Sequence, residues 1–570
     1  MLIDESSKLF LYSNKMEQNQ TKKNIGFLMQ GSILAIAGII VRIIGLIYRV
    51  PMVNIMGTKG NGYYTSAYSV YTLFLILSSY SFPAAISKII SERLAEGRLR
   101  DIKNVIRYSF ILAFFVGLIM FSVMFFGADV ISLIHRKPYL SYALRALAPT
   151  LFIMAFLSIL RGIFQGMGNM IPTAVSQIFE QIANAIGSIV FAYVLFNRGL
   201  IANLVYGSEE YSYAFGASGG AIGTGIGAFV ALIILLYWFR RLYRRYRKYL
   251  NENNSYEPES RNKIYGILFA TTVPIILSST IYNLTTVVDD LIFSNVLTIM
   301  GSELNIVVLW GVFGNYHLLF NIPVAISNAL TSSIIPSISG SVAINNVREV
   351  VLKTKYSIKY TMLIVVPSFV GLLILAEPIC KALFRDNIET LINVLRVGSI
   401  AVVFFSLSTV TNGILQGLGL YNRPLKNAVI ALIVHIIVSI VLLALFNLNI
   451  YGIVISMIIF AMILFILNQR DINRVVRYSN SKFQKRYIRT FVLMFFSAGI
   501  MGAAIYFLNQ FLTNVVFVNE NSFIIWIKLI ILMFVAVAIY LFLISLLGVI
   551  RKRDADYIPF ISKFGMLLRE

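Results

Sequence analysis

Fourteen apolar segments follow one another along this chain and constrain its fold more than any other feature. A membrane-spanning helix needs about 20 apolar residues, and segments of that length are separated here by polar connections. Their approximate limits are 27–50, 64–90, 108–128, 144–164, 173–196, 220–239, 264–288, 307–335, 358–376, 392–415, 427–446, 450–468, 490–508 and 523–548. With 58% apolar and 13% charged residues and a mean hydropathy of +0.80, the composition excludes a soluble enzyme and a disordered chain. We predict an all-α polytopic membrane protein with 14 transmembrane helices.

The basic residues identify the cytoplasmic side. A formal net charge of +23 is found in proteins that bind nucleic acid and in membrane proteins with basic cytoplasmic loops. The positions of the basic residues distinguish these two cases. If the N-terminus lies inside, the inner segments hold 36 of the 48 Lys and Arg residues and the outer loops hold six. Cytoplasmic loops carry such an excess in membrane proteins. We therefore expect no nucleic-acid partner, both termini inside, and a multi-pass protein of the bacterial cytoplasmic membrane.

The sequence repeats itself at an interval of about 250 residues. The segment 161–168 (RGIFQGMG) matches 412–419 (NGILQGLG) at an offset of 251. This offset equals six spans, an even number, so the copies have the same orientation. We predict two parallel six-helix lobes, from spans 1–6 and 7–12, with two helices appended. The predicted parts are a tail (1–26), an N-lobe (27–239), a basic loop (240–263), a C-lobe (264–468), a second basic loop (469–489), spans 13 and 14 (490–548) and a tail (549–570).

One face of the first span carries only small residues and two arginines. These residues recur every three or four positions, the spacing of one helix face: Gly31, Ala35, Gly38, Arg42, Gly45 and Arg49. An arginine within a span costs about 2.5–3.5 kcal/mol on insertion scales, and such residues face a cavity or a partner. The guanidinium fork matches phosphate oxygens, which makes Arg42 and Arg49 candidate phosphate ligands. Alternatively, Arg49 reaches the outer surface and Arg42 pairs with a structural acid.

Two further charged residues of the N-lobe are candidates. Lys88, near the end of the second span, is a possible second phosphate contact, although an ion pair with Glu92 at i,i+4 explains it equally well. Glu180 lies within the apolar fifth span. Its expected partner is Arg161 in a salt bridge inside the lobe, and the alternative is a carboxylate that titrates during transport.

The C-lobe offers polar candidates without strong charge. Asn321 and Asn328 lie on the eighth span and suit sugar hydroxyls, cation coordination or helix packing. Asp289 and its neighbour Asp290 lie near the outer end of the seventh span, where they bind a coupling cation or mark the outer interface. Three histidines and a single cysteine, Cys380, leave no His/Cys metal site to propose. We expect no catalytic residues, no metal site and no cofactor other than a coupling cation, proton or sodium.

Several of these residues belong to motifs that resemble a known family. The segments 42–51 (RIIGLIYRVP), 60–64 (GNGYY), 81–83 (SFP), 87–94 (SKIISERL) and 180–181 (EQ) resemble polysaccharide-transport proteins of the SpoVB/YtgP type. These belong to the MOP exporter superfamily, which holds the MATE multidrug transporters and the MurJ lipid II flippases. Fourteen spans favour the MurJ-like branch over the twelve-span MATE proteins. The resemblance implies that Arg42 contacts the pyrophosphate of an undecaprenyl-linked sugar precursor, with Lys88 as the nearest candidate for a second cation.

These observations favour a transporter over an enzyme. The leading hypothesis is a flippase that moves a lipid-linked cell-wall precursor, with lipid II as the first candidate, from the inner to the outer leaflet by alternating access. The alternatives are a flippase for another lipid-linked polysaccharide and a cation-coupled multidrug exporter. No Walker sequence is present, and the outer loops are too short for a glycosyltransferase site.

We expect a monomer whose partner is the lipid-linked glycan, with other cell-wall synthesis proteins as candidate partners. Spans 13 and 14 carry almost no charge. They are predicted to flank a groove for the lipid tail, lined at Gly502 and Ala536.

Overall fold

The computed structural model is helical throughout the residues that it describes, which are 20–250, 259–302, 304–476, 481–516 and 522–549. Eleven helices in this part of the chain are long and apolar enough to cross a membrane, or 12 if the bent pair Ile388–Gly398 and Ala401–Gly417 is one span. The prediction of an all-α polytopic protein is confirmed. The count of fourteen and the orientation stay predictions. Most of both predicted tails lies outside the described residues.

One long stretch accounts for part of the difference between the 14 predicted spans and the 11 or 12 helices counted here. Residues Ile36–Ala95 are counted once, although 60 helical residues rise about 90 Å, three times the thickness of the hydrocarbon core. Within this stretch Gly57 has φ 69° and ψ 170°, which breaks the helix. A second break follows the π-helix Ile76–Tyr80, where a new helix begins at Phe82 with Pro83 in its first turn. The stretch is therefore long enough for two crossings.

The described chain divides into two compact units. Unit 1 comprises Met1–Met52, Ala67–Ile131 and Tyr139–Thr280, and unit 2 comprises Val53–Ser66, Ser132–Pro138 and Ile281–Glu570. These limits do not coincide with the lobes 27–239 and 264–468. Two short segments from the N-terminal half belong to unit 2, and α9 (Arg261–Ile299) contributes to both units.

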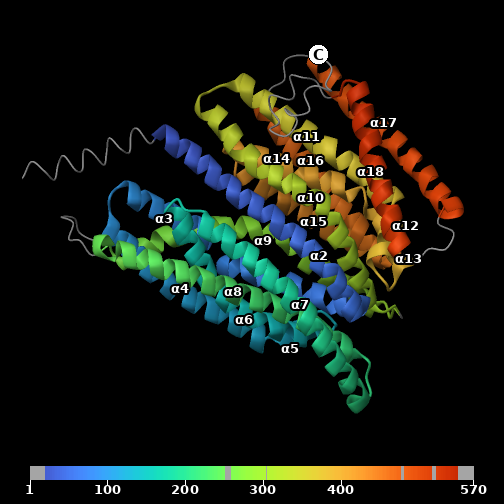
Figure 1. Cartoon of the computed structure of the whole chain (residues 1–570), viewed down its shortest axis with the longest axis horizontal. Coiled ribbons are helices and arrows are strands. Elements are labelled where there is room, and N and C mark those ends of the chain that lie inside the picture. Colours follow the sequence, from blue (N-terminus) through green and yellow to red (C-terminus); the bar gives the residue numbers. More distant parts are fainter. Residues whose placement is uncertain (1–19, 251–258, 303, 477–480, 517–521, 550–570) are drawn as a thin grey trace, which may run out of the picture. The chain divides into compact units, whose positions relative to one another are not determined.

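The helices of unit 1 pack side by side, most extensively α7 with α8, α6 with α8 and α4 with α6 (Figure 1). The helices of this unit are α2 (Gln20–Leu75, except residues 53–66), η1 (Ile76–Tyr80), α3 (Phe82–Ala95), α4 (Leu99–Phe126), α5 (Ala128–Ile134, except residues 132–134), α6 (Leu140–Gly166), α7 (Ile171–Tyr206) and α8 (Glu210–Leu250). Buried aliphatic side chains of α3, α4, α6 and α8 form the core. Helix α8 continues to Leu250, into the segment assigned to the basic loop.

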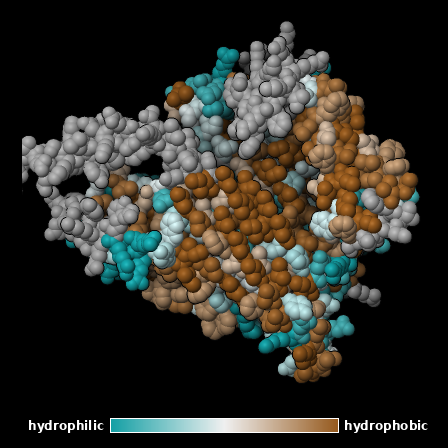
Figure 2. All heavy atoms as spheres, in the orientation of Figure 1, coloured by the Kyte–Doolittle hydropathy of each residue, from teal (hydrophilic) through white to brown (hydrophobic). Residues whose placement is uncertain are grey.

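Unit 2 holds the remaining helices. They are α10 (Ile306–Ala343), α11 (Val347–Ile374), α12 (Ala376–Leu383), α13 (Ile388–Gly398), α14 (Ala401–Gly417), α15 (Asn422–Ala444), α16 (Asn449–Val475), α17 (Ser481–Phe511), η2 (Leu512–Val516) and α18 (Ser522–Leu546). Figure 2 shows that apolar side chains cover much of the surface seen in this view. Such an apolar surface is expected of helices that face lipid.

The same local contact occurs in both units and supports the internal repeat. In unit 1, Ser91 Oγ of α3 donates a 2.9 Å hydrogen bond to the carbonyl of Gly166, the last residue of α6. In unit 2, Ser339 Oγ of α10 donates a 3.0 Å bond to the carbonyl of Gly417, the last residue of α14. A Cβ added at Gly166 would lie 2.8 Å from Ile90 Cβ. Glycine therefore permits the close approach of two helices that the repeated motif requires.

Candidate functional site

The two arginines of the first predicted span lie on one face of α2, in the part that belongs to unit 1. Arg42 is exposed and Arg49 is half-buried, with its guanidinium carbon 5.4 Å from the ring centre of Tyr68. A Cβ added at Gly38 would meet no atom within 4 Å, and one at Gly45 would meet only the Gln181 amide nitrogen, at 3.2 Å. This face is therefore open at Gly38, which leaves room for a ligand beside Arg42, and is covered by the Gln181 side chain at Gly45.

Polar side chains of α7 lie beside this part of α2. Asn184 Nδ2 donates a 3.2 Å hydrogen bond to the Tyr48 hydroxyl, and both residues are buried. One turn earlier, the Glu180 carboxylate accepts a 2.5 Å bond from Arg161 of α6. This is the salt bridge within the lobe that was expected as the structural explanation of Glu180. The charge of Glu180 is thus engaged by a residue of its own unit.

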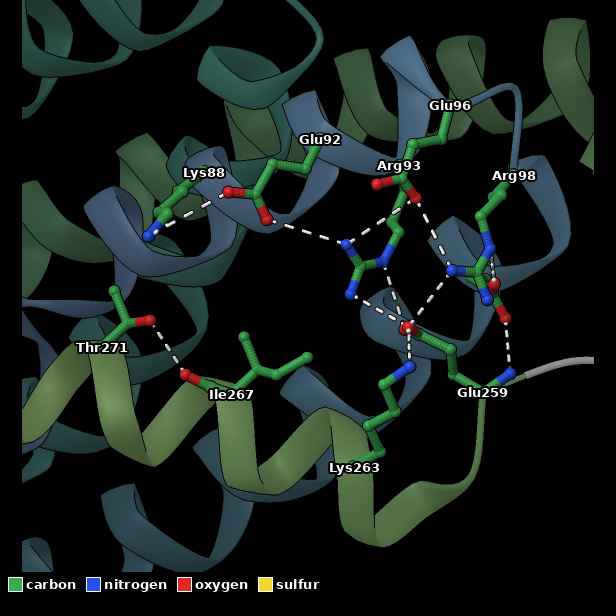
Figure 3. A network of polar contacts seen from close by, with 10 residues as sticks. Lys88, Glu92, Arg93, Glu96, Arg98, Glu259, Lys263, Ile267 and Thr271 are labelled. Atoms are coloured by element: carbon green, nitrogen blue, oxygen red, sulfur yellow. Dashed lines mark hydrogen bonds and ion pairs between the residues drawn. The ribbon is translucent and has the colours of Figure 1, made fainter.

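Lys88 lies on the exposed side of α3. Its side chain is 63% exposed, and its ammonium group lies 4.0 Å from the Glu92 carboxylate (Figure 3). This is the i,i+4 pair given above as the alternative to a phosphate contact. An exposed pair of this kind contributes about 0.3–0.5 kcal/mol, so Lys88 could exchange Glu92 for another anion at small cost.

The same view shows an ion-pair network that the sequence did not reveal. Glu259, just before α9, accepts two 3.1 Å bonds from the Arg93 guanidinium of α3 and lies 3.0 Å from the Lys263 ammonium group (Figure 3). Arg98 approaches the same carboxylate at 3.4 Å and pairs with the buried Asp101 at 2.9 Å. Burial alone would raise the pKa of Glu259, but Lys263 and Arg93 outweigh it and hold that pKa below its ordinary value. The network fixes the start of α9 to α3 and α4.

In unit 2, Asp289 is buried and bound to a histidine of another helix. Its carboxylate lies 2.6 Å from His435 Nε2 of α15, and both residues are at most 1% exposed. The alternative in which Asp289 and Asp290 mark the outer interface does not describe these positions, because both carboxylates are buried within the protein.

Asp290 is bound by the segment between α5 and α6. Its carboxylate lies 2.5 Å from Lys137 Nζ and 3.0 Å from His135 Nδ1. Sequence reasoning missed both partners. Two of the three histidines of this chain thus bind the adjacent aspartates Asp289 and Asp290.

The two predicted asparagines of α10, Asn321 and Asn328, are exposed, whereas a third asparagine of this helix is buried. Asn321 is exposed and contacts His317 at 2.8 Å, and Asn328 is also exposed. Asn315 is buried instead, and its side-chain oxygen accepts a 2.8 Å bond from Asn61. Both Asn61 and Asn315 belong to unit 2. Asn321 and Asn328 stay candidates for the pathway, whereas Asn315 packs helices together.

The positions proposed to line a lipid-tail groove are packed inside unit 2. A Cβ added at Gly502 of α17 would lie 2.7 Å from Val370 of α11, and Ala536 of α18 is 7% exposed. The expectation that these residues line the groove is therefore wrong. Gly499, one turn earlier on α17, is exposed and would meet nothing within 4 Å.

Comparison with known proteins finds membrane transporters among the proteins that this chain resembles. The family described as polysaccharide biosynthesis protein matches residues 27–342. The lipid II flippase MurJ of Bacillus subtilis (strain 168) is 25% identical over 436 residues, which are 73% of this chain and 76% of that protein.

Two solved structures share the fold. An inward-facing multidrug resistance MATE family transporter of the MOP superfamily has a TM-score of 0.61 at 18% identity, covering 78% of this chain and 100% of that chain. A lipid II flippase MurJ in an inward closed conformation has a TM-score of 0.59 at 16% identity, covering 90% of this chain and 98% of that chain.

Proposed function

Because this chain belongs to the polysaccharide biosynthesis protein family, whose model matches 316 residues from 27 to 342, we propose that it is a flippase for an undecaprenyl-pyrophosphate-linked cell-wall precursor, with lipid II as its substrate. The protein is a multi-pass protein of the cytoplasmic membrane and a relative of flippases and MOP transporters. The observation that carries the proposal is the similarity to the lipid II flippase over 436 residues.

The open face of α2 supports the proposed substrate. A pyrophosphate carries negative charge into a region of low dielectric constant, where a guanidinium group can bind two of its oxygens at once. Arg42 supplies such a group on an exposed helix surface, beside Gly38, which leaves space for the ligand. Arg49 lies two turns further along the same face.

The surroundings of Asp289 favour a proton as the coupling ion. Sodium, like other hard cations, is bound by oxygen ligands, and the group that faces the Asp289 carboxylate at 2.6 Å is an imidazole nitrogen. A carboxylate and an imidazole in hydrogen-bond contact can share and release a proton. The proposed cycle therefore couples proton movement at Asp289 and His435 to transport.

Complementation tests the proposed substrate. The chain is expressed in cells depleted of their own lipid II flippase, and growth and lipid II in the outer leaflet are measured. We expect growth to return, with outer-leaflet lipid II restored to at least half its normal level. The native flippase serves as the positive control. Failure to restore both readouts, despite normal membrane levels, would contradict lipid II as the substrate and favour another lipid-linked polysaccharide.

A cation-coupled drug exporter is the second candidate, since a multidrug resistance MATE family transporter shares the fold. This candidate predicts that the chain lowers the sensitivity of cells to cationic drugs. The flippase predicts unchanged drug sensitivity together with complementation. The two assays in one strain therefore distinguish the candidates.

A further inference from the structure

The short segment Ser132–Pro138, called the strap below, begins in the last turn of α5, ends just before α6 and belongs to unit 2. Its chain neighbours on both sides, Ile131 and Tyr139, belong to unit 1. The segment is folded on itself, because the Ser132 hydroxyl donates to the carbonyls of Lys137 (2.6 Å) and Pro138 (2.8 Å). The strap is thus a compact part of unit 2 whose ends are covalently attached to unit 1.

Lys137 fastens the strap through three contacts of its ammonium group. This group donates to Asp290 Oδ1 (2.5 Å) and to Ser66 Oγ (2.8 Å), and it lies 5.0 Å from the ring centre of Trp310. Lys137, Asp290, Ser66 and Trp310 are all fully buried. A lysine is almost never fully buried unless it is paired, and this lysine is saturated with partners.

Asp290 is saturated as well. Besides Lys137, its carboxylate binds His135 Nδ1 at 3.0 Å and accepts a 3.3 Å bond from Ser294 Oγ. At the surface, Arg136 Nε donates a 3.1 Å bond to the Asn295 side chain. Three consecutive residues of the strap therefore bind α9.

A buried ion pair with a complete set of partners is poor evidence for extra stability, because two apolar residues of the same volume often stabilise a fold at least as well. Its best-attested use is to specify one of two arrangements. When either partner is separated, both charges must be hydrated again, so the contact is either fully made or fully lost. This behaviour suits a contact that forms and breaks in a cycle.

We propose that the Lys137–Asp290 pair is a latch that holds the strap on α9 in the state described here and releases it once in each transport cycle. The proposal rests on the transport function proposed above. The chain neighbours of the strap belong to unit 1, and its polar contacts lie in unit 2. Any cycle that changes the arrangement of the two units therefore has to pull on the contacts of the strap. The strap lies on the side predicted to be outside, where water can reach the released charges.

Reversible cross-linking tests the proposal. In a Cys380→Ala background, Arg136→Cys and Asn295→Cys are joined by a reducible bifunctional thiol reagent. We expect transport to fall at least tenfold and to recover on reduction, whereas each single cysteine treated with the same reagent transports normally. Glu377→Cys with Lys381→Cys, one turn apart on the exposed surface of α12, is the matched control and should stay active. Full transport by the cross-linked strap would overturn the latch.

A second measurement does not depend on the substrate. Ser294 is fully buried beside Asp290, so a cysteine there reports release of the strap. With Asp290→Asn, labelling of Ser294→Cys by a thiol reagent should accelerate at least tenfold. With Lys137→Met and Asp290→Leu together, which removes both charges and keeps the strap packed, labelling should stay slow while transport is lost. Equal labelling rates in all three proteins would overturn the proposal, even if the chain transports another substrate.

Discussion

The guanidinium group of Arg161 lies 2.5 Å from the carboxylate of Glu180, and this ion pair joins α6 to α7 within unit 1. The side chains are 11% and 22% exposed, so water screens the pair only in part. We expect Glu180→Gln to lower the free energy of unfolding by about 1–2 kcal/mol, because it weakens a charge-assisted hydrogen bond. Thermal unfolding in detergent measures the change. A variant of unchanged stability that no longer transports would show instead that Glu180 titrates during the cycle.

Arg42 is expected to contact phosphate. Two substitutions at this position distinguish the contribution of its positive charge from that of its forked guanidinium group. Arg42→Ala should reduce flipping at least tenfold at normal membrane levels. Arg42→Lys should keep part of the activity, because a single ammonium group lacks the fork of the guanidinium group. Arg198→Ala, at an exposed position of α7, is the control and should be active. Full complementation by Arg42→Ala would exclude this residue as a phosphate ligand.

The predicted orientation can be checked with single cysteines in a Cys380→Ala background. Arg100 and Glu209 are both exposed, at the start of α4 and just before α8. An impermeant thiol reagent added outside intact cells should label Glu209→Cys and leave Arg100→Cys unlabelled. The opposite pattern would refute the orientation derived from the distribution of basic residues.

The Glu259 network should give stability a defined dependence on pH. The pKa of this buried carboxylate lies below its ordinary value, so its contribution is complete above that ordinary value and is lost as the pH falls through the lower, folded-state pKa. We expect Glu259→Gln to destabilise the protein by about 1–3 kcal/mol near pH 7. The difference from the unsubstituted chain should shrink below about pH 4.

Unfolding temperatures measured across this pH range test the Glu259 prediction. Glu377→Gln removes the partner of Lys381 in a pair whose side chains are 47% and 43% exposed, and it should have little effect. A difference for Glu259→Gln that grows as the pH falls would contradict the assigned direction of the pKa.

Two glycines of α17, one turn apart, differ in their surroundings, because Gly499 faces open space and Gly502 packs against Val370. Gly499→Trp adds a large side chain in open space and should weaken binding of a long-chain lipid several-fold, with little change in stability. Gly502→Trp should destabilise the fold by about 1–3 kcal/mol or more, since it collides with Val370. Binding of short- and long-chain analogues to each variant is the measurement. Equal losses for both analogues in Gly499→Trp would exclude a tail groove at this position.

Local patterns in the sequence predicted much of this architecture. Long apolar runs require helices in a membrane, since every backbone polar group has to be satisfied within the segment. The repeated glycine motif predicted two related lobes, and the structure has the same hydrogen bond at Gly166 and Gly417, one in each copy. The Arg161–Glu180 pair was predictable as well, since it joins the end of one span to the span that follows it.

Contacts between distant parts of the chain were not predictable in this way. Lys137 and Asp290 are 153 residues apart, and no periodicity connects a loop residue to a particular carboxylate. The same holds for Glu259 and Arg93, which are 166 residues apart. Gly502 illustrates a different limit, because an apolar helix has similar residues on the side that faces lipid and on the side that faces protein.

Asp289 and Asp290 are consecutive residues of α9, and their partners come from different parts of unit 2. Side chains of adjacent residues point about 100° apart around a helix axis. The two contacts lie at different angles around α9 and therefore fix the rotation of this helix about its own axis. A rotation that loosens the carboxylate from His435 also moves the next carboxylate relative to Lys137. In the proposed cycle, a proton taken up at Asp289 would therefore act on the strap through the rotation of a single helix, with no intervening chain of side-chain contacts.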